Sequence, residues 1–419
     1  MNVLSSRVCK GTTAAIGTSV CHKSAAFYGS KSFDFILFPG YLTAYFFCFK
    51  GMQPSDGNIP ITALAVSTYT IPTETPESDG TIKWESTTMV LVTIEAGGKT
   101  GIGYSYADAS AAFLIANSLK DLVIGKNALD IPAITHWLIH QIRNNGNTGI
   151  GMMAISAIDN ALWDLKAKLF DVPLCLLLGK VKEEMLLYGS GGFTSYTDYQ
   201  LQQQLGGWAE EGLKYVKMKI GRHPEQDTYR VKLAREAIGA ETALYVDANG
   251  GYTVKQAIAM AQEFAAYDIS WYEEPVNSDN LEGLRFIREH LPGGVSIAAG
   301  EYGYNLPYFK AMLAANAVDV LQADATRCGG ISGFLKAGYL CEAWQLPFSS
   351  HCAPALHLHA ALSLPSFFIA EYFFDHARIE NMLFDGVAQP ENGALRPDLS
   401  RPGFGIDFKY NDAEKYKVH

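Results

Sequence analysis

The feature that most constrains this chain is an eightfold alternation of apolar strand patterns and helical patterns that begins at residue 185. No hairpin signal interrupts the alternation, so successive strands are expected to be parallel, with helices as the crossovers. Eight such units predict an α/β fold, a closed (β/α)8 (modified TIM) barrel. We expect the strands at 185–188, 215–220, 243–246, 269–272, 295–298, 318–322, 347–350 and 367–370.

A different pattern precedes the barrel. Two segments alternate like strands of an antiparallel sheet, with a polar loop at 71–86 between them, and three helical segments follow. The strands are expected at 61–69 and 88–95, and the helices at 111–119, 131–142 and 152–169. We interpret 59–184 as an N-terminal α+β capping domain, 185–372 as the barrel, and 373–419 as a loop-rich C-terminal segment that returns to the cap and completes it.

The first 58 residues do not resemble the rest of the chain. They mix Ser, Gly, Lys and Cys with an aromatic stretch at 35–49, which is short for a membrane span and lacks the order of a signal peptide. We interpret 1–58 as an atypical leader, disordered or non-native, with Met52 as a plausible start; a membrane anchor is the alternative. On the first interpretation, deletion of residues 1–51 should leave folding and activity intact.

Charge and cysteine usage narrow the partners and the compartment. The formal net charge is −10 and no long run of Lys and Arg occurs, which argues against nucleic acid as a partner. The seven cysteines are odd in number and scattered without CxxC spacing. That pattern argues for a reducing compartment and a cytoplasmic protein without a membrane partner.

The active site of such a barrel forms at the carboxyl ends of its strands. Acids stand there on three successive strands: Asp247, Glu273 and Glu301. A single acid at a strand end would more often cap a helix, but three converging carboxylates repel one another unless a cation lies between them. Oxygen-only ligands predict Mg²⁺, with Mn²⁺ as an alternative. Glu274 could compete with Glu273, but neighbouring strand residues face opposite ways.

Two further pairs occupy strand ends. Lys217 and Lys219 face the same side of their strand, and nearby cations and burial can depress the pKa of a lysine until it serves as a base. Taken alone, they could equally be ion-paired barrel residues. Asp324 and His351 end adjacent strands, where a carboxylate would fix the imidazole tautomer for proton transfer. We interpret His357 and His359 as packing or surface residues, because the three histidines lack the spacing of a zinc site.

The order of these strand ends, KxK, then D, E and E, then D, H and E, resembles the mandelate racemase subgroup of the enolase superfamily. Local strings that resemble this family are VKMKIG at 216–221, VDANGGYT at 246–253, WYEEP at 271–275, AAGE at 298–301 and QADATRCGG at 322–330. AISAIDNALWDLKAK at 154–168 is similar to the family helix that joins cap and barrel. The resemblance covers about residues 60–410, and the leader is its one departure.

The resemblance implies Mg²⁺-dependent abstraction of the proton next to a substrate carboxylate, through an enediolate. It implies Lys219 as the base on one face and His351, held by Asp324, on the other. Lys217 neutralises the carboxylate or tunes Lys219, and a protonated Glu371 donates a hydrogen bond to the enolate oxygen.

Smaller features leave alternatives open. Asn249 either contacts the substrate or is a turn residue. Gly329 and Gly330 either cradle an anion or form a tight turn.

The polar composition of residues 71–84, which resemble the family's lid, favours a polyhydroxylated substrate. We therefore expect a lyase, a hydro-lyase that dehydrates a sugar acid to a 2-keto-3-deoxy acid. The alternative is a racemase, epimerase or cycloisomerase acting on a hydroxy acid or sugar lactone. A non-catalytic barrel protein would be expected to have lost one of these groups, and none is missing. The expected partners are a small-molecule carboxylate, a sugar acid, and further copies of the chain in a homo-oligomer.

Overall fold

The protein is described by a computed structural model that covers residues 57–418. The predictions for residues 1–51, including deletion of the leader, lie outside the described residues. Eight parallel strands form a closed barrel, because each pairs with the next along the chain and the last pairs with the first. They are β4 (Met185–Gly191), β5 (Tyr215–Lys219), β6 (Ala243–Asp247), β7 (Ile269–Glu273), β8 (Ser296–Ala299), β9 (Val320–Ala323), β10 (Phe348–Ser350) and β11 (Phe367–Phe373).

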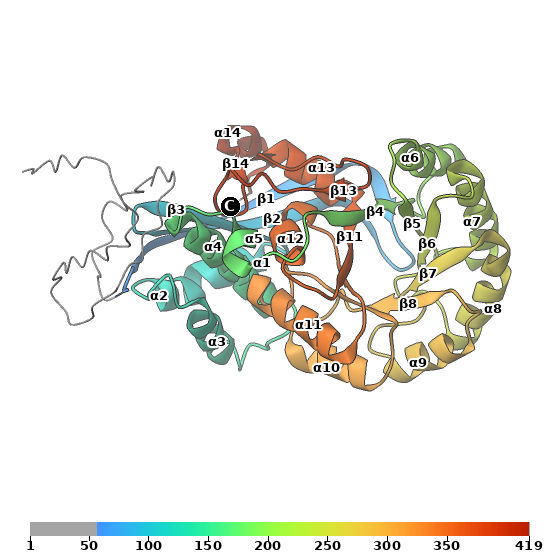
Figure 1. Ribbon diagram of the computed structural model, residues 1–419, viewed down its shortest axis with the longest axis horizontal. Helices are drawn as coiled ribbons and strands as arrows, with labels where there is room; N and C mark the ends of the chain where they lie inside the picture. The colour runs from blue at the N-terminus through green and yellow to red at the C-terminus, as the bar shows by residue number, and fades with distance from the viewer. Residues whose placement is uncertain (1–56, 419) are drawn as a thin grey trace, which may run out of the picture. The chain divides into compact units, whose positions relative to one another are not determined.

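Helices connect these strands and cover the outside of the barrel (Figure 1). They are α6 (Asp198–Glu210), α7 (Pro224–Ile238), α8 (Val254–Phe264), α9 (Leu281–His290), α10 (Leu306–Ala314), α11 (Gly330–Trp344) and α12 (Pro354–Ala361), with a short 3-10 turn η2 (Ala265–Tyr267) after α8. Thr197 and Thr253 begin α6 and α8 with capping boxes, which satisfy backbone donors that each first turn leaves free. The predicted parallel barrel is confirmed.

A three-stranded antiparallel sheet precedes the barrel, with the order β1 (Ile61–Ser78), β2 (Lys83–Ala96) and β3 (Lys99–Tyr106). The predicted loop at 71–86 is wrong, because β1 and β2 continue through it as a long hairpin and only 79–82 turn. Polar residues pair across the hairpin: Glu77 faces Trp84, and the hydroxyls of Thr70 and Thr88 lie 3.0 Å apart. The polar composition of this segment therefore belongs to a hairpin that extends beyond the sheet, not to a loop. The third strand, β3, was not predicted from the sequence.

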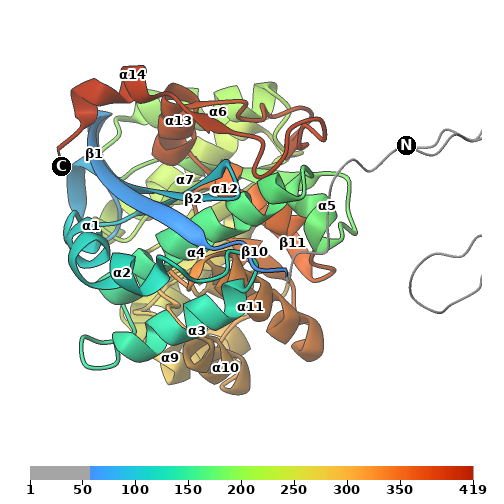
Figure 2. The same ribbon diagram turned by 90° about the vertical axis from the view of Figure 1, so that its left-hand side faces the viewer.

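Helices follow this sheet in the cap. They are α1 (Ser110–Leu114), the π-helix η1 (Ile115–Leu119), α2 (Lys120–Val123), α3 (Ile131–Gln141), α4 (Ile150–Leu169) and α5 (Leu174–Leu178). Of these, α4 packs directly on β2 and β3, while α3 packs on α4. The backbone of α4 lies so close to β3 that a Cβ added at Gly103 would fall 2.2 Å from the Ala161 nitrogen, so this position has to be glycine. In Figures 1 and 2, α4 runs between the sheet and the barrel helices α11 and α12.

The C-terminal segment is more regular than predicted. It contains α13 (Phe374–Leu383), β12 (Phe384–Asp385), β13 (Ala394–Leu395), β14 (Asp407–Phe408), α14 (Tyr410–Ala413) and η3 (Glu414–Tyr416). β13 pairs antiparallel with β4 of the barrel, and the Val418 nitrogen donates to the Thr68 oxygen of β1 at 2.9 Å. Figure 2 shows α14 beside the end of β1. The segment thus touches both barrel and cap.

Two further observations concern the helices and the cysteines of the described residues. Within residues 57–418, no helix is both long enough and apolar enough to cross a membrane. The four cysteines in this range, Cys175, Cys328, Cys341 and Cys352, are free thiols and buried.

Candidate active site

Strand register brings the predicted site residues to one end of the barrel. Lys219, Asp247 and Glu273 are aligned across β5, β6 and β7, each the last residue of its strand. Glu301 follows β8, and Gly300 before it has φ +134°, with no room for a Cβ, which would lie 2.1 Å from the Gln322 oxygen. The glycine permits the turn that directs Glu301 toward the barrel axis.

Asp247, Glu273 and Glu301, called here the acidic triad, converge. One carboxylate oxygen from each lies within 4.8 Å of those from the other two, and all three side chains are buried. Burial and the charge of Asp247 raise the pKa of Glu273, and the Glu301 Oε2 atom is buried without a hydrogen-bond partner. An oxygen-only donor set with an unsatisfied oxygen fits a hard divalent cation such as Mg²⁺. Glu274 is not part of the triad, as expected if its side chain points to the opposite side of the strand from that of Glu273.

Lys217 lies beneath the triad and is fully buried. Its Nζ is 2.5 Å from Glu273 Oε1, 2.8 Å from Glu371 Oε1 and 3.4 Å from Asp247 Oδ2. Burial opposes the charge of Lys217, but Glu273 and Glu371 outweigh it, so the pKa of Lys217 lies well above its ordinary value. Lys217 is therefore a fixed positive charge that neutralises the surrounding acids.

Lys219 is buried at the edge of the same cluster, with Nζ 2.5 Å from Asp247 Oδ2. Burial disfavours its charge, but Asp247 more than compensates, and the pKa of Lys219 is raised. The sequence led us to expect a depressed pKa for Lys219, and this expectation is wrong. The contact with Asp247, which the sequence does not show, outweighs both burial and the nearby cation Lys217.

His351 and Asp324 form the predicted pair. His351 Nδ1 lies 2.8 Å from Asp324 Oδ2, and both side chains are buried. Burial acts against the charge of Asp324, but the hydrogen bond and charge of His351 lower the pKa of this carboxyl. The other imidazole nitrogen, Nε2, is 3.3 Å from Glu301 Oε2 and 3.2 Å from the Cys352 sulfur. The pair orients the ring so that Nε2 faces the triad.

Glu371 differs from its predicted state. Its oxygens accept from Ser190 Oγ at 2.6 Å and from the Cys352 nitrogen at 2.8 Å, in addition to Lys217. Burial favours the neutral acid, but Lys217, His351 and Lys219 hold the pKa of Glu371 well below its ordinary value. Glu371 is thus an ionised acceptor, and the prediction of a protonated donor is wrong. Sequence alone did not show that Lys217 would point at it.

A cavity of about 160 Å³ opens beside the triad. Lys219 and His351 both line it, together with Glu301 and Arg327. Arg327 was not singled out from the sequence. Arg327 donates to the backbone carbonyl oxygen of Glu301 at 3.1 Å and lies 3.6 Å from the carboxylates of Glu301 and Asp324. Its position, three residues after Asp324 in the strand-end string 322–330, was the available signal.

The β1–β2 hairpin reaches from the cap sheet toward the barrel (Figure 1). Asp79, Ile82, Trp84 and Thr87 line the cavity. At the tip, a Cβ added at Gly80 would lie 2.2 Å from the Ala248 oxygen and 2.7 Å from that of Ile220, so the hairpin rests directly on the barrel backbone. The structure thus places this segment over the cavity, as expected of a lid.

Of the remaining residues considered from the sequence, one lines the cavity and two form a turn. Asn249, at φ +45°, lines the cavity, and its Oδ1 is buried without a partner. Gly329 and Gly330 form a tight turn at the start of α11, whose free amides donate to Ser156, Asn160 and Asp159 of α4. Side chains of α4 therefore accept the hydrogen bonds that a bound anion would have accepted, and the tight-turn interpretation of the two glycines holds.

His357 and His359 are buried on α12 and bond to backbone groups, as expected of packing residues. Among the described residues they form no metal cluster with His351.

Comparison with known families identifies this architecture. Residues 64–179 match the N-terminal domain of mandelate racemase / muconate lactonizing enzyme, and residues 200–413 match the enolase C-terminal domain-like family. The chain belongs to the mandelate racemase / muconate lactonizing enzyme family of the enolase superfamily. Within that family it is similar to acid-sugar dehydratases and cycloisomerases.

Two curated relatives illustrate the range. L-talarate/galactarate dehydratase from Salmonella typhimurium is 31% identical over 78% of this chain and 83% of the relative. D-galactarolactone cycloisomerase from Agrobacterium fabrum is 29% identical over 82% of this chain and 95% of the relative.

Solved structures show the same fold. A mandelate racemase/muconate lactonizing enzyme-like protein from Rubrobacter xylanophilus superposes with a TM-score of 0.84 at 51% identity, covering 86% of this chain and 100% of that one. A racemase from Streptomyces coelicolor with bound magnesium gives a TM-score of 0.80 at 30% identity, covering 85% and 100%.

Proposed function

We propose that this protein is a Mg²⁺-dependent enzyme that removes the α-proton of a sugar acid and eliminates water to give a 2-keto-3-deoxy acid. The observation that carries the proposal is the shared cavity. Lys219 and His351, two groups able to transfer protons, line one small space beside three converging carboxylates. The dehydratases and cycloisomerases among the relatives support acid-sugar chemistry of this kind.

Asp247, Glu273 and Glu301 would hold the metal, and the magnesium in the related structures supports this assignment. When bound, Mg²⁺ acts as a Lewis acid that stabilises negative charge developing on a carboxylate. Its charge would also offset that of Asp247, which raises the pKa of Lys219. Mn²⁺ has the same preference for oxygen ligands and is the alternative cation.

Lys219 and His351 each carry out one of the two proton transfers. A neutral Lys219 takes the α-proton and becomes the ammonium, and the electron pair of the C–H bond moves into the enediolate. His351, protonated and held by Asp324 at 2.8 Å, gives a proton from Nε2 to the 3-hydroxyl as the C3–O bond breaks. Water leaves, and the resulting enol tautomerises to the 2-keto-3-deoxy acid. Lys217 holds compensating charge in place, and Asn249 Oδ1 is a free acceptor for a substrate hydroxyl.

Product analysis tests the reaction. The enzyme is incubated with Mg²⁺ and a library of aldonic and aldaric acids, and 2-keto acids are measured. We expect a keto acid from at least one member and none after EDTA treatment. Epimerised acids or products derived from lactones, with no keto acid, would instead support a racemase, epimerase or cycloisomerase.

A variant separates the two proton transfers. His351→Asn should lower kcat for dehydration by about 10²–10⁴-fold, the usual contribution of a positioned acid. Lys219 should still exchange the α-proton with solvent in D₂O when a substrate presents that face, which NMR detects. The matched control is His290→Asn, an exposed histidine on α9. Full dehydration by His351→Asn would overturn the role of His351.

A further inference from the structure

A second and larger cavity, called here the side cavity, adjoins the catalytic cavity at Asn249 and Tyr302, which line both. Its volume is about 610 Å³, against about 160 Å³ for the catalytic cavity. Protein sites for small organic ligands usually enclose about 300–1,000 Å³. The catalytic cavity is below this range, so the part of a sugar acid that does not react has to extend elsewhere, and the side cavity is the adjoining space.

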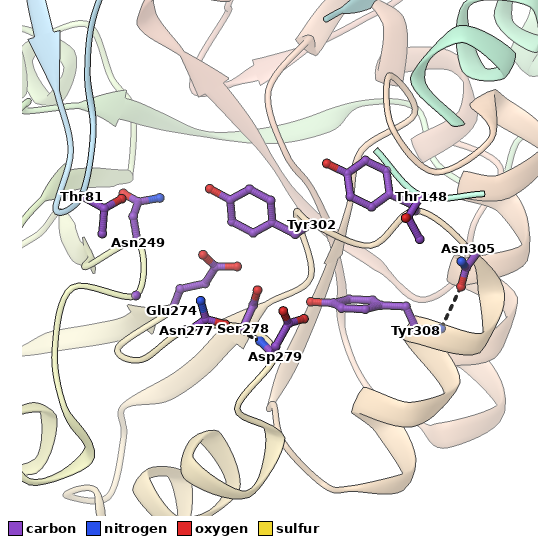
Figure 3. Close-up of a pocket in the computed structure, with 12 residues that line it drawn as sticks. Thr81, Thr148, Asn249, Glu274, Asn277, Ser278, Asp279, Tyr302, Asn305 and Tyr308 are labelled. Atoms are coloured by element: carbon purple, nitrogen blue, oxygen red, sulfur yellow. Dashed lines mark hydrogen bonds between the residues drawn. The ribbon is translucent and has the colours of Figure 1, made fainter. Parts of the chain in front are cut away.

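The lining of the side cavity contains acids, amides and hydroxyls but no positive charge. Most of it comes from the loops after β6, β7 and β8, with Glu274 and Asp279 as its acids, and Thr81 and Thr148 of the cap complete it. No Lys, Arg or His is among the described residues that line it. Figure 3 shows Glu274, Ser278 and Asp279 on one side of this space and Tyr302 on the other. Such a lining accepts hydrogen bonds from hydroxyl groups but offers a carboxylate no cation, and a carboxylate buried without a cation is costly.

Two buried acceptors in this lining have no partner. Glu274 Oε1 and Asn249 Oδ1 are both buried and form no hydrogen bond. Their residues are 1% and 9% exposed and adopt φ values of +36° and +45°. An unpaired buried acceptor costs about 1–3 kcal/mol, and left-handed backbone at non-glycine residues adds strain that is common at functional sites. A ligand with hydroxyl donors would satisfy both acceptors.

We propose that the side cavity receives the uncharged, hydroxyl-bearing far end of the substrate, so that the enzyme accepts aldonic acids and rejects aldaric acids. This inference rests on the proposed function, which places the reacting carboxylate beside the acidic triad and leaves both classes of acid open. An aldonic acid ends in a neutral hydroxymethyl group. An aldaric acid of the same configuration ends in a second carboxylate, which would face Glu274 and Asp279.

Binding measurements test the proposal apart from turnover. His351→Asn enzyme with Mg²⁺ is titrated calorimetrically with three pairs of matched configuration: gluconate and glucarate, galactonate and galactarate, mannonate and mannarate. We expect at least one aldonate to bind 10-fold or more tightly than its aldarate. Adding Asp279→Lys should shift that ratio at least 10-fold toward the aldarate. Glu282→Lys, an exposed acid on α9 outside the cavity, should leave the ratio within 2-fold.

Each alternative result is decisive. Preference for the aldarate in every pair, no binding of any acid, or equal shifts from Asp279→Lys and Glu282→Lys would overturn the inference. Dehydration of aldarates by the wild-type enzyme, without an effect of Asp279→Lys, would overturn it and leave the proposed function intact. Absence of turnover and α-proton exchange with every acid in the library would overturn the proposed function itself.

Discussion

Buried carboxyl groups occur in two regions of this molecule. Glu273 at the barrel mouth has a raised pKa, because burial and Asp247 outweigh Lys217, but two of its neighbours contrast with the acids of the second region. At the barrel mouth, Asp247 and Glu371 contact Lys217, and although burial opposes their charge, the neighbouring lysines hold the pKa of both below the ordinary range. At the seam between cap and barrel, burial raises the pKa of Glu77 and Glu380 to about 8 and that of Asp159 to about 6.

The partners explain the difference. Glu380 accepts from the Tyr104 hydroxyl at 2.5 Å and the Ala355 nitrogen at 3.0 Å, and Glu77 accepts from Trp84 Nε1 at 2.8 Å. Within residues 57–418, no Lys or Arg forms an ion pair with Glu77, Asp159 or Glu380. Neutral donors suffice to bury an acid that keeps its proton, whereas an ionised acid needs a cation beside it.

The two regions also differ in what their acids contribute to the protein. Two of the seam acids, Asp159 and Glu380, link cap to barrel through ordinary hydrogen bonds, and this role contributes to stability. The mouth concentrates charges that would be expensive to bury one by one, and such arrangements are typical of sites that perform chemistry. Variants that remove charge should therefore affect the mouth strongly and the seam weakly.

The largest effect is expected from Lys217→Met. It leaves Glu273 and Glu371 buried without their cation, and removal of one partner of a buried ion pair costs about 3–5 kcal/mol. Urea unfolding should show that loss, and activity should fall below detection. Lys83→Met is the matched control, because the Lys83–Glu85 pair is exposed and should contribute less than about 1 kcal/mol.

A second substitution sharpens this result. Lys217→Met combined with Glu371→Gln removes one of the uncompensated charges and should recover part of the lost stability without restoring activity. If the double variant is less stable than Lys217→Met alone, the loss arises from packing and the charge argument fails.

Divalent cations should give the next largest effect. Convergence of Asp247, Glu273 and Glu301 predicts that Mg²⁺ binds the folded protein and raises its melting temperature. Ligand present at 100 times its Kd stabilises by about 2.7 kcal/mol. Glu301→Gln should lose most of this shift, and the exposed Glu282→Gln should keep it. An equal shift in both variants would place the cation elsewhere.

The barrel was predictable because its signal repeats. Eight apolar runs, each followed by a helix, leave little choice of topology, and the strand ends then follow from the chain order. Asp247, Glu273 and Glu301 could be placed at one mouth for that reason. The acidic triad and the Asp324–His351 pair depended only on which residue ends each strand, and the structure brings these groups together.

Features that depend on side-chain contacts were not predictable from the sequence. The protonation of Glu371 depends on the direction of Lys217, and the raised pKa of Lys219 depends on a contact with Asp247. The hairpin over 71–86 was missed because polar residues on a strand that leaves its sheet lack the alternation of a half-buried strand. Arg327 was missed because its role follows from the loop conformation after β9.

The smallest effect concerns Glu77, the seam acid on the hairpin. Burial and the charge of Asp375 raise its pKa to about 8, so the folded chain binds this proton more tightly than the unfolded chain does. The resulting stability is complete below the unfolded pKa of about 4.3 and is lost as the pH rises through about 8. Glu77→Gln keeps an oxygen for Trp84 and cannot ionise. Its stability relative to wild type in urea should therefore increase by about 1–2 kcal/mol between pH 6 and pH 7.5. Glu95→Gln, an exposed acid on β2, should show no such increase. A difference that is independent of pH would mean that Glu77 is already ionised in the folded protein, and the contrast between seam and mouth would fail at this residue.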